Sequence, residues 1–150
     1  MLTARELMRG DAITLTPDML VEDAVKTLLR KRISGAPVVT DGQVVGMFSE
    51  RDALTALAAA SYESEPSGTV GMHMRREPIS ISPATDMFAI AAEFNRNPVR
   101  RLIVVDSDGR MLGVVMRGDL LRALVERTPP SEAHPARTAL ERATERLRDP

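Results

Sequence analysis

The stretch GMFSERD (residues 46–52) returns further along the chain as GVVMRGD (residues 113–119). In both copies a glycine opens an apolar run of strand character, and an aspartate follows shortly after that run. The aspartate falls in the first turn of an expected helix, where the positive end of the helix dipole favours an acidic side chain. The chain therefore builds the same strand–helix junction twice.

The similarity between the two halves extends well beyond this junction. Met8-Arg9 aligns with Met74-Arg75, and a single insertion in the turn DSDG (106–109) then shifts the alignment by one position. The new register holds from Gly46 and Gly113 into the following helices, where Ala56-Leu57 meets Ala123-Leu124. A match of this extent with one gap indicates a duplicated structural unit.

Each copy predicts the element order β-α-β-β-α. AITLTP (12–17) and PISISP (78–83) alternate apolar and hydroxyl residues, which is typical of short strands. Two apolar runs joined by a turn with Asp-Gly predict a hairpin over 36–49 and another over 102–116. Second helices are expected at about 50–60 and 117–127, and short helical turns at Ala4–Met8 and Val70–Met74. A helical apolar stripe precedes each hairpin: Val21, Ala24, Val25, Leu28 and Leu29, then Met87, Ile90, Ala91 and Phe94. Asp18 and Thr85 are the nearby capping candidates for these stripes.

A unit of roughly 60 residues buries too little surface to fold comfortably alone. We expect the two copies to pack their sheets around a pseudo-twofold axis and to share one core. The predicted division is a first repeat over 1–60, a linker over 61–69, a second repeat over 70–128 and a tail over 129–150. The tail predicts a C-terminal helix with Leu140, Ala143 and Leu147 on one face. A solvated extension and a dimer contact or cleft cover both remain open for it.

The composition is that of an ordinary soluble globular protein. Hydrophobic residues make up 43% of the chain and charged residues 27%. No apolar run approaches the ~20 residues of a membrane helix, and the N-terminus MLTARELMRG is too charged for a secretory signal. We therefore expect a cytoplasmic protein without a membrane partner. The net charge of −1 and the few aromatic residues argue against a nucleic-acid partner. The absence of cysteine excludes disulfides and thiolate sites.

The duplicated unit and its junctions resemble the tandem CBS module, named for the cystathionine β-synthase domain. The resemblance covers roughly residues 3–127 and is carried by four stretches: LMRGDAITLTP (7–17), KRISGAPVVTDGQVVGMFSERDAL (31–54), HMRREPISISP (73–83) and RRLIVVDSDGRMLGVVMRGDLL (100–121). It implies an α/β (α+β) fold of two β-α-β-β-α CBS repeats packed around a pseudo-twofold axis. It also implies a homodimer that binds adenosine-containing nucleotides in clefts between repeats and reports metabolic status to a regulated protein. Without an attached catalytic or transport domain, the resemblance implies a stand-alone sensor or adaptor with an unknown partner.

The chemistry of the first junction suits a nucleotide. The carboxylate of Asp52 offers two acceptor oxygens to the cis-diol of a ribose, and backbone N–H groups at the helix start suit a phosphate. The resemblance assigns Ser49 and Asp52 to ribose and phosphate, although Ser49 also has the spacing of a helix cap. In the second repeat Met116 replaces Ser49 while Asp119 keeps the acidic group. We expect the second cleft to bind more weakly, to bind something different or to stay empty.

The remaining candidates surround these junctions. We expect the base to lie against Ile13 and Ala36-Pro37-Val38 in the first repeat, with backbone groups of Thr14 and Ser34-Gly35 reading the adenine edge. Ile79 and Leu102-Ile103 form the matching apolar wall in the second repeat, where Arg100-Arg101 makes the cleft more positive. Arg51 and Arg117 either reach phosphates or form surface ion pairs. The candidate nucleotide-binding residues are Ile13, Thr14, Ser34, Gly35, Ala36, Pro37, Ser49, Arg51, Asp52, Ile79, Arg100, Arg101, Leu102, Arg117 and Asp119.

Catalysis finds little support in the sequence. His73 and His134 do not fall at a metal-ligand spacing, and no nucleophile elbow or Walker loop occurs. We therefore expect no enzyme, no metal site and no catalytic cofactor. Two hypotheses remain: a regulatory module for AMP, ADP or ATP, with S-adenosylmethionine or NAD as further options, and a structural dimerisation or interaction module with vestigial ligand clefts.

Overall fold

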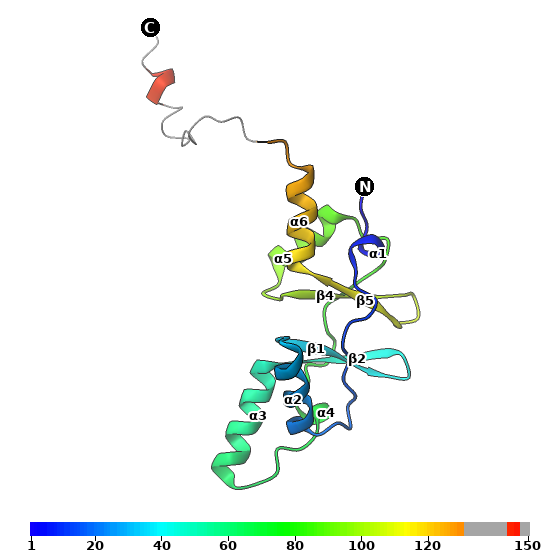
Figure 1. Ribbon diagram of the computed structural model, residues 1–150, viewed down its shortest axis with the longest axis vertical. Coiled ribbons are helices and arrows are strands. Elements are labelled where there is room, and N and C mark those ends of the chain that lie inside the picture. Colours follow the sequence, from blue (N-terminus) through cyan, green and yellow to red (C-terminus); the bar gives the residue numbers. More distant parts are fainter. Residues whose placement is uncertain (131–143, 148–150) are drawn as a thin grey trace.

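The computed structural model describes residues 1–130 and 144–147 and stacks two small sheets face to face between outer helices (Figure 1). This mixed architecture confirms the α+β class. The first half holds α2 (Val21–Lys31), β1 (Gly35–Thr40), β2 (Gln43–Ser49) and α3 (Glu50–Glu63). The second half holds β3 (Ser80–Ile81), α5 (Met87–Arg96), β4 (Arg101–Val105), β5 (Met111–Met116) and α6 (Arg117–Arg127). The short helices α1 (Ala4–Leu7) and α4 (Val70–His73) precede the two halves.

Both hairpins form as the Asp-Gly turns predict. Strands β1 and β2 pair antiparallel from Gly35 opposite Ser49, and β4 and β5 pair equivalently from Arg101 opposite Met116. Helices α3 and α6 then begin directly after the second strand of each hairpin. The repeated junction therefore places an aspartate in the first turn of a helix twice, at Asp52 and at Asp119.

The expected strand over 12–17 is wrong in extent. Only Leu15 bridges Val38, with hydrogen bonds to the backbone of Pro37 and Val39. Pro17 has no N–H to donate, which stops the ladder shortly afterwards. In the second half the strand does form, because Ser80 and Ile81 both pair in parallel with β4.

Three expectations about helix ends also need correction. Asp86, not Thr85, caps α5, with Oδ1 accepting from the backbone N–H groups of Phe88 and Ala89 at 2.9 and 3.0 Å. Asp18 lies too far upstream to cap α2, whose first N–H donates instead to the carbonyl of Gly68 at 3.1 Å. Helix α3 runs to Glu63, into the expected linker 61–69, before Ser64 ends it in a left-handed conformation.

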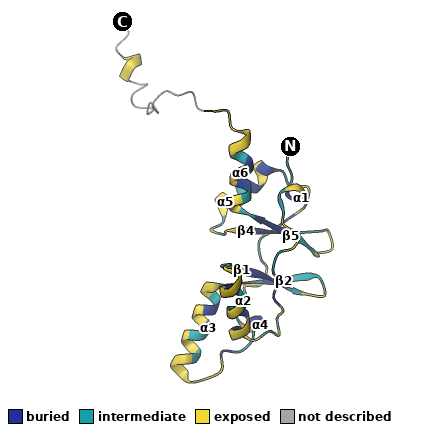
Figure 2. Cartoon of the chain, in the orientation of Figure 1, coloured by how far each residue is buried: buried dark blue, intermediate teal, exposed yellow. Residues whose placement is uncertain are grey.

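The apolar side chains form two clusters in place of the single shared core expected (Figure 2). The cluster around Leu28 and Phe48 of the first half includes Val70, which precedes the second half. The cluster around Ile90 and Leu102 of the second half includes Ala4, from the start of the chain. Each half therefore completes its core with the segment that leads into the other half.

Backbone pairing fixes this exchange. Arg75 and Met47 exchange two N–H···O bonds of 2.8 and 2.9 Å, and Arg9 and Val114 exchange two of 2.9 and 3.1 Å. Glycine is required beside each crossing: a Cβ on Gly46 would lie 2.9 Å from the carbonyl oxygen of Arg75, and one on Gly113 would lie 2.7 Å from that of Arg9. The glycine that opens both copies of the junction thus admits a crossing backbone.

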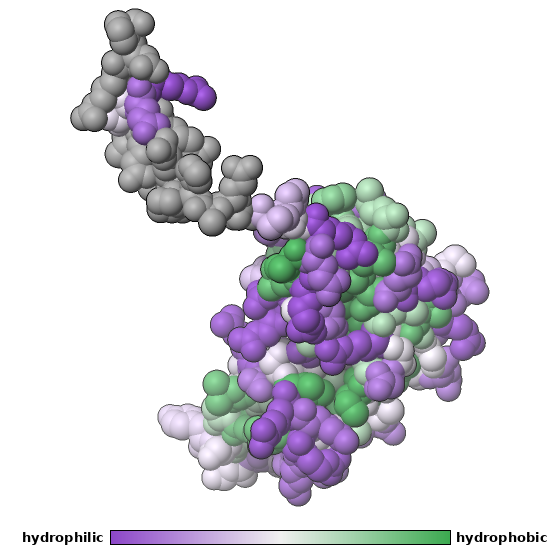
Figure 3. All heavy atoms as spheres, turned by 45° about the horizontal axis from the view of Figure 1, so that its top comes forward, coloured by the Kyte–Doolittle hydropathy of each residue, from purple (hydrophilic) through white to green (hydrophobic). Residues whose placement is uncertain are grey.

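The hairpin tips of the two halves also meet. Val44 donates its N–H to the carbonyl of Gly109 at 3.2 Å, and Met111 donates to that of Gly42 at 3.0 Å. The two sheets are therefore joined at the turn end, and the opposite end of the strands is left for a site. Hydrophilic residues cover much of the face in Figure 3, with apolar side chains in smaller patches over both halves. Within residues 1–130 and 144–147 no helix has the length and apolar character needed to span a membrane.

The tail prediction is mostly untested, since Leu140 and Ala143 lie outside the described residues. Thr144–Arg146 are helical and Leu147 is exposed. The role of residues 129–150 stays a prediction.

Replacing Gly46 or Gly113 by alanine should destabilise the fold. The added methyl group would meet the carbonyl oxygen of Arg75 or of Arg9, and two backbone hydrogen bonds hold each of these residues in place. We expect a loss of about 1–3 kcal/mol in the free energy of unfolding, as for other overpacked sites. Gly10→Ala is the control, because its Cβ would have its nearest neighbour at 3.9 Å. Denaturant unfolding measures all three, and equal stabilities would contradict the close crossing.

Candidate functional site

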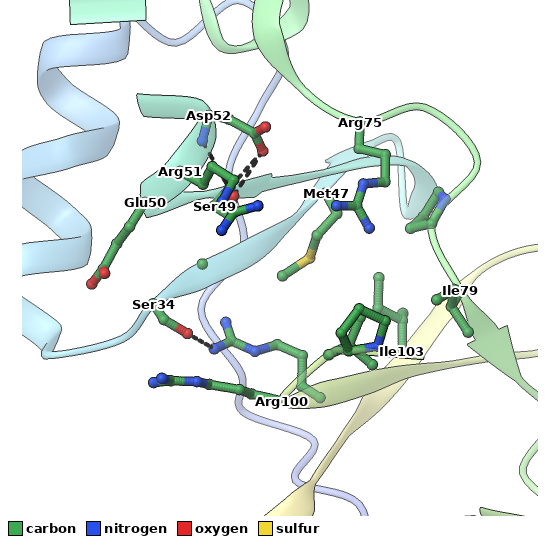
Figure 4. A pocket seen from close by; sticks show the side chains of 15 residues that line it. Ser34, Met47, Ser49, Glu50, Arg51, Asp52, Arg75, Ile79, Arg100 and Ile103 are labelled. Atoms are coloured by element: carbon green, nitrogen blue, oxygen red, sulfur yellow. Dashed lines mark hydrogen bonds between the residues drawn. The ribbon is translucent and has the colours of Figure 1, made fainter. Parts of the chain in front are cut away.

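A cavity of about 490 Å³ lies between the two sheets, at the end of the strands opposite the hairpin tips (Figure 4). Its size is in the range of small-molecule sites. Both halves contribute to it. The lining residues are Ser34, Gly35, Met47, Ser49, Glu50, Arg51, Asp52, Arg75, Pro78, Ile79, Pro98, Val99, Arg100, Arg101 and Ile103.

The apolar part of the wall comes mainly from the second half. Ile79 and Ile103 face Met47 across the cavity (Figure 4). Ile79 reaches this position because Arg75 pairs with Met47, which brings the following residues alongside β2. Along β4 successive side chains alternate between faces, so Leu102 and Val104 enter the helix-facing core while Ile103 faces the first half. An aromatic base would find an apolar surface here, which includes the branched side chains of Ile79 and Ile103.

The first junction supplies the polar wall. The Ser49 hydroxyl and backbone N–H both donate to Oδ2 of Asp52 at 3.0 Å, and the Asp52 N–H donates back to Ser49 Oγ at 3.3 Å. This capping box fixes the carboxylate at the start of α3. Within the described part of the chain Oδ1 accepts no hydrogen bond, so one carboxylate oxygen remains available to a ligand.

The second junction is arranged differently. Arg9 donates Nε to Oδ2 of Asp119 at 2.8 Å and Nη2 to Oδ1 at 3.0 Å, and Arg122 also donates to Oδ1. These bonds, of which the one from Arg9 has the largest effect, hold the pKa of Asp119 below its ordinary value. Partial burial acts in the opposite direction and raises the pKa. Both carboxylate oxygens are therefore occupied, and Met116 offers no hydroxyl in place of Ser49.

The equivalent arginine of the first junction is placed differently. Arg75 occupies the position of Arg9 in the repeat, yet it lines the cavity and forms no ion pair among residues 1–130 and 144–147. The two related junctions thus differ: among the described residues Oδ1 of Asp52 accepts no hydrogen bond, whereas both carboxylate oxygens of Asp119 accept bonds from Arg9.

Eight of the fifteen candidate residues line this cavity. They are Ser34, Gly35, Ser49, Arg51, Asp52, Ile79, Arg100 and Arg101. The other seven do not: Ile13, Thr14, Ala36, Pro37, Leu102, Arg117 and Asp119. Ala36 and Leu102 lie in the two cores, because strand alternation turns them away from the facing sheet.

The cavity also differs from the expectation that each base site lies within one repeat. Ser49 and Asp52 of the first half face Ile79 and Ile103 of the second half. Seven lining residues were missed as candidates, or named only as part of a wall: Met47, Glu50, Arg75, Pro78, Pro98, Val99 and Ile103. The alternation along β4 could have selected Ile103 over Leu102. No sequence pattern indicated that Arg75 lines the cavity, because its position depends on backbone pairing with Met47 of the other half.

Comparison with known proteins supplies the family. The model of the CBS domain matches residues 4–59 and 69–126. The chain belongs to the CBS domain family. Each of the two matches corresponds to one of the structural halves, together with its leading helical turn.

CBS relatives share most of the length of this chain. The uncharacterized protein MJ1225 of Methanocaldococcus jannaschii is 33% identical over 121 residues, which cover 80% of this chain and 42% of that protein. The gamma-3 subunit of 5'-AMP-activated protein kinase from Bos taurus is 32% identical over 109 residues, which cover 68% of this chain and 22% of the subunit. The chain thus spans less than half of either relative. The crystal structure of CBSX2 in complex with AMP superimposes with a TM-score of 0.75 at 28% identity, covering 85% of this chain and 98% of that one.

Among the residues that the structure describes, no group of three or more His, Asp or Glu side chains comes together. His73 Nε2 lies 2.7 Å from the carbonyl oxygen of Ser67, away from the residues that line the cavity.

Replacing Arg9 by glutamine should raise the pKa of Asp119 toward its ordinary value, since the largest stabilising hydrogen bond to the carboxylate is lost. Carboxyl NMR titration measures this shift directly. The native pKa lies below the unfolded value of about 3.9, so the pair stabilises the fold above that pH, and its contribution disappears as pH falls through the native pKa. An unchanged Asp119 pKa in Arg9→Gln would contradict the bidentate pairing.

Proposed function

We propose that this chain is a regulatory, non-catalytic module that binds one adenosine-containing ligand in the cavity between its CBS repeats. The observation that carries the proposal is the fixed carboxylate of Asp52, whose Oδ1 accepts no hydrogen bond within residues 1–130 and 144–147 and which lines the cavity together with an apolar wall from the other repeat. The Asp52 carboxylate suits a ribose diol, and the apolar wall suits a base.

The relatives support an adenosine ligand. CBSX2 has been crystallised with AMP, and the kinase that contains the gamma-3 subunit is activated by 5'-AMP according to its name. AMP, ADP and ATP are the proposed ligands, with S-adenosylmethionine and NAD as further options. Ser49 and Asp52 would hold the ribose, Ile79 and Ile103 the base, and the arginines the phosphates. A ligand that binds more tightly to one relative arrangement of the two proposed repeats, 1–60 and 70–128, would shift the population of the chain toward that arrangement.

Asp52→Asn should remove most of the stabilisation that AMP or ATP gives to the protein. A ligand at a hundredfold excess over its Kd stabilises the folded state by about 2.7 kcal/mol, and the amide loses the charge that strengthens bonds to the diol. Thermal denaturation with and without ligand measures the gain within each variant, which removes the effect of a weakened cap.

Asp119→Asn is the matched control, because it removes the same charge at the equivalent position of the second junction, where Arg9 already pairs with the carboxylate. It should keep the full ligand-dependent gain, and calorimetric titration should give one ligand per chain. Equal losses in both variants, or two ligands per chain, would contradict the single-site proposal. No gain with any adenosine compound would contradict the proposed function itself.

A second candidate function, an interaction module, draws on the outer helices. Leu54 on α3 and Leu121 on α6 occupy equivalent places in the repeat, and the two residues are 71% and 56% exposed. Exposed positions lie along the outer faces of both helices (Figure 2). We propose that these faces pair two copies of the chain as a homodimer in the cytoplasm.

Leu54→Glu should weaken such a dimer, because it places a charge in an apolar contact. Sedimentation velocity over a concentration series measures the change, with Thr55→Glu on the same exposed turn as the control. A wild-type chain that stays monomeric at all concentrations would contradict the homodimer without affecting the ligand site.

A further inference from the structure

The cavity carries more positive charge than its own acidic residues can balance. Four arginines line it, namely Arg51, Arg75, Arg100 and Arg101, against the two carboxylates of Glu50 and Asp52. Asp52 is already engaged by the capping box. No ion pair ties any of the four arginines to a carboxylate within residues 1–130 and 144–147. The lining of the cavity therefore holds more cationic than acidic side chains.

Arg101 is the most constrained of these residues. Its side chain is half-buried at the start of β4, and Nη2 donates to Ser34 Oγ of the other half at 2.6 Å. Burial lowers the pKa of Arg101, and the neighbouring charge of Arg100 lowers it further. An arginine side chain nevertheless stays protonated in proteins. Arg100 is exposed, so solvent screens part of the repulsion between these adjacent like charges, and an anion beside them would offset more of it.

The arginines are grouped by position as well as by charge. Ile79 and Ile103 stand at one end of the cavity, whereas Ser34 and Arg100 stand at the other (Figure 4). Arg51 follows Ser49 on the polar wall, close to the carboxylate that would hold a ribose. A nucleoside with its base at the apolar end and its ribose at Asp52 would direct its 5' substituent toward Arg51, Arg100 and Arg101.

We infer that the cavity selects nucleotides with a polyphosphate tail, adenosine di- or triphosphate, over AMP, adenosine and S-adenosylmethionine. This inference rests on the proposed function. Guanidinium groups match phosphate oxygens in fork geometry, and each added phosphate supplies negative charge and further acceptors to donors that AMP would leave unmatched. S-adenosylmethionine carries a sulfonium and an ammonium group against one carboxylate, so its net positive charge is repelled by the same arginines.

Calorimetric titration of the full chain in EDTA at constant ionic strength tests the order of affinities. ADP and ATP should each bind at least about tenfold more tightly than AMP, which corresponds to one good additional contact. S-adenosylmethionine should bind more weakly than AMP. Affinity for ATP should also fall more steeply with added salt than affinity for adenosine, since only the tail depends on charge.

Variants locate the effect. Arg100→Gln should weaken ATP binding by about tenfold or more while adenosine binding changes by less than about threefold. The control is Arg76→Gln, which removes the same positive charge. Arg76 is exposed and follows Arg75 in the chain, but unlike Arg75 it does not line the cavity. Arg76→Gln should leave the ratio of ATP to AMP affinity unchanged, and thermal denaturation verifies that each variant is folded.

The outcomes separate this inference from the proposed function. AMP or S-adenosylmethionine binding as tightly as ATP would overturn the polyphosphate selectivity, while the adenosine site would stand. Equal losses of ATP affinity in Arg100→Gln and Arg76→Gln would overturn the assignment to the cavity arginines. Failure of every adenosine compound to bind would overturn both proposals. The order measured with the unmodified protein decides the selectivity even if a variant does not fold.

Discussion

The close crossing of two backbones beside Gly46 and Gly113 is the constraint on which the molecule depends. At each crossing a leading segment of one repeat pairs with the second hairpin strand of the other, and a side chain at either glycine would meet a carbonyl oxygen at less than 3 Å. The same segments deliver Ala4 and Val70 into the opposite cores. Neither half therefore has a complete core without the other, which is how a unit of this small size becomes stable.

The cavity is a direct consequence of this exchange. Because Arg75 is held against Met47, Ile79 enters the space in front of Ser49 and Asp52, and the site consists of residues from both repeats. A ligand that touches both walls is sensitive to their separation, which is the property that a regulatory module needs. At the second junction Arg9 engages both oxygens of the Asp119 carboxylate, whereas its counterpart, Arg75, forms no ion pair with a carboxylate among residues 1–130 and 144–147.

Structural features that depend on neighbouring residues could be predicted from the sequence, whereas features that depend on contacts between the two halves could not. The hairpins, the helices and the Ser49–Asp52 cap follow from turn chemistry, periodicity and short spacings. The alternating pattern over 12–17 did not show that only Leu15 would pair with β1. Helix α2 lacks its expected cap because the carbonyl of Gly68, from a distant segment, accepts the first N–H of the helix. The sequence named Leu102 and Ile103 together as an apolar wall, and the structure places only Ile103 at the cavity, because successive side chains of β4 face opposite sides of the sheet. The pairing of Arg9 with Asp119 joins residues 110 positions apart, so spacing carried no signal for it.

The central claim is that both CBS repeats contribute to one ligand site. Chemical-shift mapping of backbone amides during titration with an adenine nucleotide tests it most directly. The account predicts simultaneous, saturable shifts at Ser49–Asp52 in the first repeat and at Ile79 and residues 99–103 in the second, with little change around Asp119. Shifts confined to one repeat, or centred on Asp119 and Ile13, would contradict it.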